Sequence, residues 1–184
     1  MAGVLINDMD IHKEAAPVLS QVVTATGETA HLAILDGLDT IYIHKEEGTH
    51  PAHIKTHLGK RNPTYPTSSG KVLLAYSPPE LTEQIIEKGL ERYTPNTITD
   101  PDKLRTALKN IKRNGYATSR EEFTPGVISI AAPVFDYTGK VVAAVTVVGS
   151  AKRMRPQKRT EFARIVKNAA ADVSERLGYD SRFI

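Results

Sequence analysis

The sequence lacks cysteine altogether, and aromatic residues make up only 6% of its 184 residues. A chain without cysteine forms no disulfide bonds and has no thiolate for metal or redox chemistry. No apolar run is long enough to span a bilayer. The first residues have neither the basic region nor the apolar stretch of a signal peptide. These absences predict a cytoplasmic protein with no membrane partner.

An excess of charge of one sign is also missing. The chain has 24 basic and 21 acidic residues, a net charge of +3. The excess comes mostly from one short run, which comprises Lys152, Arg153, Arg155, Lys158 and Arg159. A DNA-reading domain normally concentrates more positive charge on one face. We interpret the run as solvated surface at the start of a helix, and we expect this chain not to contact DNA by itself.

The hydrophobic pattern predicts one α+β domain. Apolar spacing and start and stop signals predict helices over residues 10–26, 67–75, 78–89, 100–115 and 157–177. Pro17 is expected near the start of the first helix or at a kink in it. Alternating or β-branched runs predict strands over 29–35, 40–44, 116–123, 127–135 and 141–148. The strands come in hairpins with helices between and after them. This order favours an antiparallel sheet covered by helices over the regular βαβ alternation of a nucleotide-binding fold.

The stretch Thr67-Ser68-Ser69-Gly70-Lys71 is the most informative local motif. A phosphate-binding P-loop needs a glycine where this chain has Tyr65 and a hydroxyl residue where it has Val72, so that motif is excluded. What remains is a helix start rich in hydroxyls, whose unpaired N–H groups and dipole favour an anion such as a carboxylate. An ordinary Ser/Thr helix cap without a ligand is the alternative.

Two further groups of polar residues are candidates for chemistry. Glu121 and Glu122 are adjacent, but neighbouring side chains on a strand face opposite sides, which argues against a catalytic pair. Four histidines, His44, His50, His53 and His57, lie close in sequence. Pro51 and Gly48 argue against the helix that would align them on a metal, so we interpret them as surface residues.

Taken in order, these segments resemble the effector-binding domain of IclR-type bacterial transcription regulators. The resemblance covers most of the chain, and its most specific pieces are residues 67–75, Glu121-Glu122 with Gly126, residues 129–136, and residues 142–149 after Gly139. It implies a GAF-like fold, in which helices flank a curved antiparallel sheet. We interpret residues 15–184 as one such domain and residues 1–14 as a linker and the entry into its first helix. Met1-Ala2-Gly3 is interpreted as a start added to the natural sequence.

The resemblance also implies function. Family members carry a winged helix-turn-helix DNA reader upstream, which is absent from this chain, form homodimers and tetramers, and sense small organic acids without a cofactor. Matching positions assign the effector site to Ser68, Ser69, Gly70, Ser119, Ser129, Thr146 and Val148. Val148 stands where members that bind a short keto acid tend to have a hydroxyl, which suggests a different or more apolar effector. Ile54 and Leu58, in the loop before the site, are expected to form a lid or an apolar wall.

Two alternatives belong to other classes of protein. One is a small hydrolase or isomerase that uses Glu121 or Ser129, although no base is positioned by the sequence beside a nucleophile. The other is a dimerisation module with an empty pocket. Stabilisation by small acids without turnover would distinguish a sensor from both.

Overall fold

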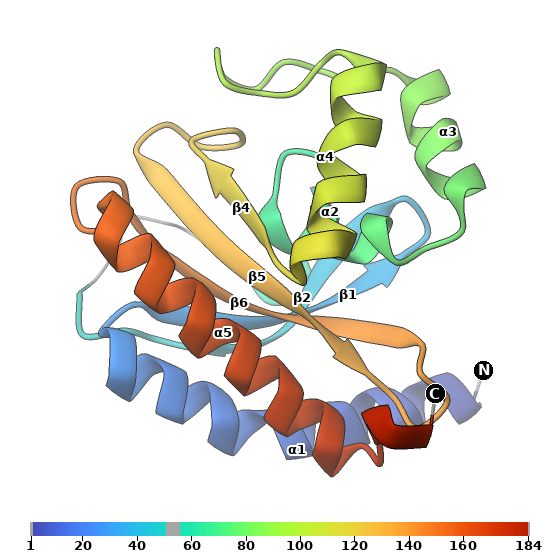
Figure 1. Ribbon diagram of the computed structural model, residues 1–184, viewed down its shortest axis with the longest axis vertical. Helices are drawn as coiled ribbons and strands as arrows, with labels where there is room; N and C mark the ends of the chain where they lie inside the picture. The colour runs from blue at the N-terminus through green and yellow to red at the C-terminus, as the bar shows by residue number, and fades with distance from the viewer. Residues whose placement is uncertain (1, 51–55, 184) are drawn as a thin grey trace.

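The protein is described by a computed structural model that covers residues 2–50 and 56–183. One antiparallel sheet of six strands, in the order β3-β2-β1-β6-β5-β4, divides the molecule into two helical layers (Figure 1). The strands are β1 (Thr29–Asp36), β2 (Asp39–Glu46), β3 (Arg61–Pro63), β4 (Ala117–Arg120), β5 (Val127–Phe135) and β6 (Val141–Ser150). The helices are α1 (Ala2–Thr26), α2 (Ser68–Ala75), α3 (Pro79–Lys88), α4 (Pro101–Asn114) and α5 (Pro156–Arg176), followed by a 3₁₀ turn at Ser181–Phe183. The α+β plan with an antiparallel sheet is confirmed.

The two long helices α1 and α5 lie side by side against one face of the sheet (Figure 1). Their apolar stripes, with Leu19 and Val166 fully buried, pack on inward residues of the central strands such as Leu32 and Val145. The opposite face is covered by α2, with α4 and α3 outside it. A second apolar cluster around Leu74 and Leu104 closes that layer. Burial of both faces explains why the central strands are almost continuously apolar.

Both predicted hairpins are confirmed. β1 pairs with β2, and β5 pairs with β6 from Val127 opposite Ser150 to Phe135 opposite Val141. Helix α4 begins after Asp100, whose carboxylate accepts a hydrogen bond from the Lys103 N–H, and it ends at Gly115 in the left-handed conformation. The sequence signals for these elements were strong because turn residues and apolar periodicity agreed.

Several predicted boundaries were wrong. Helix α1 begins at Ala2, before the predicted start at residue 10, and passes through Pro17. The division between residues 1–14 and 15–184 stays a prediction. Strand β4 ends at Arg120, because Glu121 adopts a positive φ of 55° that leaves the extended conformation. Helix α3 begins at Pro79, one residue later than predicted, and no side chain caps it, since the Ser77 hydroxyl donates to the Leu73 carbonyl of the preceding helix.

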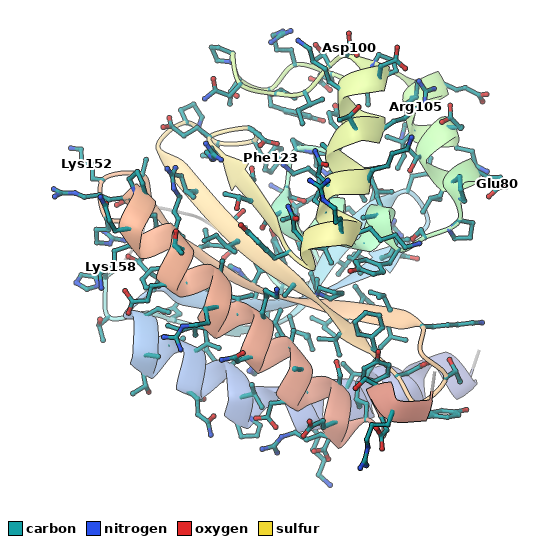
Figure 2. All side chains as sticks on the ribbon, in the orientation of Figure 1. Glu80, Asp100, Arg105, Phe123, Lys152 and Lys158 are labelled. Carbon is teal, nitrogen blue, oxygen red and sulfur yellow. The ribbon has the colours of Figure 1, made fainter. Side chains whose placement is uncertain are left out.

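No helix in residues 2–50 and 56–183 is long and apolar enough to cross a membrane. The basic run at the start of α5 projects outward, as Lys152 and Lys158 show in Figure 2. Lys158 pairs with Glu161 at 3.0 Å, and Lys152 and Arg155 are exposed. Lys152, Arg155 and Lys158 are solvated surface, as expected. Arg153 is not, because its guanidinium donates to both carboxylate oxygens of the buried Glu28, at 2.6 and 2.8 Å.

Candidate functional site

The first turn of α2 is buried against the sheet. Thr67 caps the helix, and its hydroxyl accepts a hydrogen bond from the Gly70 N–H at 3.1 Å. The Lys71 N–H donates to the Thr67 carbonyl at 3.0 Å. Within the described part of the chain, the N–H groups of Ser68 and Ser69 have no acceptor. Both residues are at most 1% exposed, so two free donors and the positive end of a helix dipole face the interior.

The sheet brings the predicted hydroxyl residues beneath this helix tip. The Ser68 hydroxyl donates to the Ser129 hydroxyl at 2.7 Å. Ser119, Ser129 and Val148 are register partners across β4, β5 and β6, so their side chains share one face. Thr146 lies on the same face two residues from Val148. The structure therefore gathers residues from four elements that are far apart in the sequence.

Gly70 has a packing role at this tip. A Cβ atom there would lie 2.1 Å from the Thr64 carbonyl oxygen and 2.4 Å from its Cα atom. No non-glycine residue fits without moving backbone. The glycine allows the close approach that buries the tip, and the Gly70 N–H is bonded to the Thr67 hydroxyl.

A Gly70→Ala substitution is therefore expected to destabilise the domain by about 1–3 kcal/mol, the usual cost of overpacking. Urea denaturation measures this loss. Gly37→Ala provides a contrast, because a Cβ atom at this turn glycine would meet nothing within 4 Å and the strain comes only from the positive φ of the backbone. A stable Gly70→Ala variant would show that the tip is not packed as described.

Four buried polar atoms have no hydrogen-bond partner among the described residues. They are Ser69 Oγ, Thr146 Oγ1, His31 Nδ1 and Thr40 Oγ1. An unsatisfied buried polar group costs about 1–3 kcal/mol, so native proteins rarely leave several together. Thr146 and His31 are direct register partners on β6 and β1, and Thr40 shares its sheet face with them. These three residues therefore lie on the sheet face that α2 covers.

His31 and Tyr42 lie on the same face of the sheet, and neither was predicted from the sequence as a site residue. Their rings stack at 4.5 Å with an interplanar angle of 23°. Burial, together with the nearby charges of Lys45 and His44, lowers the pKa of His31 to about 3. Burial raises the pKa of Tyr42. A histidine inside the apolar run of β1 was the available sequence signal.

Other predicted site residues have different surroundings. The Ser119 hydroxyl donates to the Pro66 carbonyl at 2.7 Å, so it braces the segment that leads into α2. Leu58 is 58% exposed, and its side chain does not close the site in this structure. Ile54 lies outside the described residues. The lid or wall role of Ile54 and Leu58 stays a prediction.

The two adjacent glutamates, Glu121 and Glu122, make structural contacts. Lys71, 3% exposed, places its Nζ 2.7 and 2.9 Å from the carboxylate oxygens of Glu122 and 2.7 Å from the Thr118 carbonyl. The Glu121 carboxylate accepts a hydrogen bond from the Gly126 N–H. Both glutamates follow β4 rather than lie on it, so the expected reason for their separate roles was wrong. Each carboxylate is engaged in a structural contact.

The four histidines do not converge. His44 Nδ1 lies 2.7 Å from His12 Nε2, and its Nε2 lies 2.8 Å from Glu46, on the α1 side of the sheet. Its side chain is only 14% exposed, which corrects the surface assignment for this residue. His50 and His57 are exposed, and His53 lies outside the described residues. Residues 2–50 and 56–183 contain no group of three or more side chains arranged to hold a metal.

A groove of about 660 Å³ lies elsewhere, near the end of α5. It is lined by Tyr76, Phe135, Tyr179 and neighbouring residues. None of the four unpartnered polar atoms lines it. Aromatic rings that line it pack on one another, with the Phe135 and Tyr179 ring centroids 4.8 Å apart. We therefore interpret the groove as a gap at the junction between packed elements.

The fold and the buried polar cluster define a ligand-sensing domain. The family model of the bacterial transcriptional regulator IclR C-terminal domain matches residues 4–175. The chain belongs to the IclR family of transcriptional regulators and corresponds to their C-terminal domain.

Relatives and solved structures agree with this assignment. The chain is 35% identical to the transcriptional regulator RhmR of Escherichia coli, covering all of this chain and 71% of RhmR. It is 33% identical to KdgR of the same organism, covering 95% of this chain and 66% of KdgR. Thermotoga maritima IclR superimposes with a TM-score of 0.87 at 35% identity, covering 92% of this chain and 69% of that one. An IclR homologue of Microbacterium hydrocarbonoxydans, solved with 4-hydroxybenzoate, gives 0.86 at 26% identity, covering 92% and 69%. The chain thus spans about two thirds of these relatives.

Proposed function

We propose that this domain binds a small organic carboxylate at the tip of α2. The carboxylate accepts hydrogen bonds from the N–H groups of Ser68 and Ser69 and from the Ser69 hydroxyl. The observation that carries this proposal is the burial of these donors, without acceptors, at the positive end of a helix. Charge-assisted hydrogen bonds of this kind hold a carboxylate without a buried arginine.

The surrounding face supports an effector with an apolar part. Val148 and Ala131 lie beside Ser129 and Thr146 and offer no hydrogen bonds. An apolar chamber with a few polar groups is the usual form of a small-molecule site. The relative solved with 4-hydroxybenzoate holds an acid of this composition.

In the full-length cytoplasmic regulator, binding shifts the domain between two states and changes how paired DNA readers are presented by a dimer or tetramer. The chain acts as a sensor and not as an enzyme. The hydroxyl of Ser129 is bonded to Ser68 rather than to a general base, and Glu121 and Glu122 are held by other contacts.

A thermal-shift titration with small acids tests the proposal. Pyruvate, gluconate and 4-hydroxybenzoate are probes of three sizes, and we expect at least one to raise the Tm saturably without turnover. Ser69→Asp places a like charge at the helix tip and is expected to abolish that rise. Ser69→Ala, which removes only the hydroxyl, is expected to weaken affinity about tenfold, or about 1.4 kcal/mol.

Ser20→Asp is the matched control, because Ser20 is exposed on α1 and the substitution makes the same charge change. Circular dichroism establishes that each variant is folded. Acid binding that is equal in wild type and in both Ser69 variants would place the carboxylate elsewhere.

A further inference from the structure

We propose that His31 and Thr146 form a second, uncharged subsite, which selects effectors that carry a hydroxyl or carbonyl group in addition to the carboxylate. This inference rests on the proposed function of the α2 tip. It assigns a specificity role to His31, a residue outside the site predicted from the sequence.

The two side chains lie side by side on one face of the sheet. His31 and Thr146 are register partners on neighbouring antiparallel strands, which puts their Cα atoms about 4.5–5.5 Å apart with side chains on the same face. Each is 1% exposed. His31 Nδ1 and Thr146 Oγ1 are both without a partner in the described part of the chain. A single hydroxyl or carbonyl oxygen between them would satisfy both.

The orientation of the His31 ring is fixed by its other contacts. Its Nε2 lies 2.9 Å from the Thr56 hydroxyl, and one ring face stacks on Tyr42. The ring therefore cannot rotate freely to bring Nδ1 to a protein partner.

The two subsites differ in charge. The α2 tip offers the positive end of a dipole and suits a carboxylate. The His31 ring is neutral at physiological pH, because burial and the nearby Lys45 and His44 disfavour its protonated form. It therefore attracts no second carboxylate and suits an uncharged polar group. Thr146, which can donate or accept, fits either a hydroxyl or a carbonyl.

The test uses pairs of acids that differ by one hydroxyl. Lactate with propanoate, 3-hydroxybutanoate with butanoate, and 4-hydroxybenzoate with benzoate are titrated into the 184-residue protein by calorimetry. For a pair that binds, we expect the hydroxylated acid to bind wild type at least about tenfold more tightly than its partner. Leaving the two buried atoms unpaired accounts for the difference.

Three variants separate recognition from structural support. An asparagine amide occupies the position of histidine Nδ1, and a glutamine amide occupies that of Nε2. His31→Asn is therefore expected to keep the preference for the hydroxylated acid, and His31→Gln is expected to lose it although the Thr56 contact is kept. Thr146→Val, which has the same shape without the hydroxyl, is expected to reduce the preference to within about twofold.

Each failure has a distinct signature. Equal wild-type affinity for both members of every pair that binds would overturn this inference and leave the carboxylate site intact, since the two atoms would then hold only water. Loss of preference in His31→Asn with its retention in His31→Gln would assign His31 a purely structural role through Thr56. If no acid of either kind binds wild type, the proposed function fails, and this inference fails with it.

Discussion

The Glu122→Ala variant is expected to lose about 3–5 kcal/mol of unfolding free energy, because it leaves a buried charge without its partner. The Lys71 side chain is 4% exposed and that of Glu122 is 12% exposed. Burial lowers the pKa of Lys71, and Glu122 opposes that shift through charge and hydrogen bonding. Without Glu122, the ammonium must either remain buried and unpaired or lose its proton. Urea denaturation at pH 7 measures the loss.

A matched control and a double variant define the origin of this effect. Glu161→Ala breaks the exposed pair with Lys158 and is expected to cost less than about 1 kcal/mol. The double variant Lys71→Met with Glu122→Leu is expected to be more stable than Glu122→Ala, since it removes both charges and keeps apolar volume. A Glu122→Ala variant no less stable than Glu161→Ala would show that the ion pair does not anchor α2.

The second large effect is a loss of folding stability at low pH, which comes from His31. Its pKa is about 3 in the folded state, against 6.5 for an ordinary histidine. Between these values the unfolded chain binds a proton that the folded chain does not, so stability falls as pH falls. The slope from this one group approaches about 1.4 kcal/mol per pH unit below pH 6, so the loss is about 2 kcal/mol between pH 6.5 and 4.5.

His31→Asn removes this contribution, because asparagine does not titrate. The difference in unfolding free energy between wild type and His31→Asn is expected to shrink or reverse in favour of the variant as pH falls from 6.5 to 4.5. His57→Asn, which replaces an exposed histidine, serves as the control and is expected to leave the profile unchanged. A wild-type profile parallel to that of His31→Asn would mean that His31 is accessible to protons in the folded protein.

The sheet and most helices were predictable because short-range signals agreed with long-range packing. Turn residues at Asp36–Asp39 and Asp136–Gly139 separated strongly β-prone runs, and the apolar stripe of α5 had a helical period. The predictions were wrong where tertiary contacts determine the local structure. β3 lies in a segment without periodicity and forms only because Arg61–Pro63 pairs with β2.

The same distinction applies to the site. The tip of α2 was predictable because cap and dipole are local properties of Thr67–Lys71. Its burial and the contact between Ser68 and Ser129 depend on the sheet bringing together residues 61 positions apart. His31 was missed because its significance depends on its register with Thr146 and its stacking on Tyr42. No local pattern in the sequence carries that information.

We propose that a carboxylate binds at the tip of α2, between this helix and the sheet. A crystal structure of the domain with a stabilising acid is the decisive test. Electron density for the carboxylate is expected within hydrogen-bond distance of the Ser68 and Ser69 N–H groups. An acid bound instead in the groove beside Tyr76 and Phe135, with the α2 tip unchanged, would contradict it.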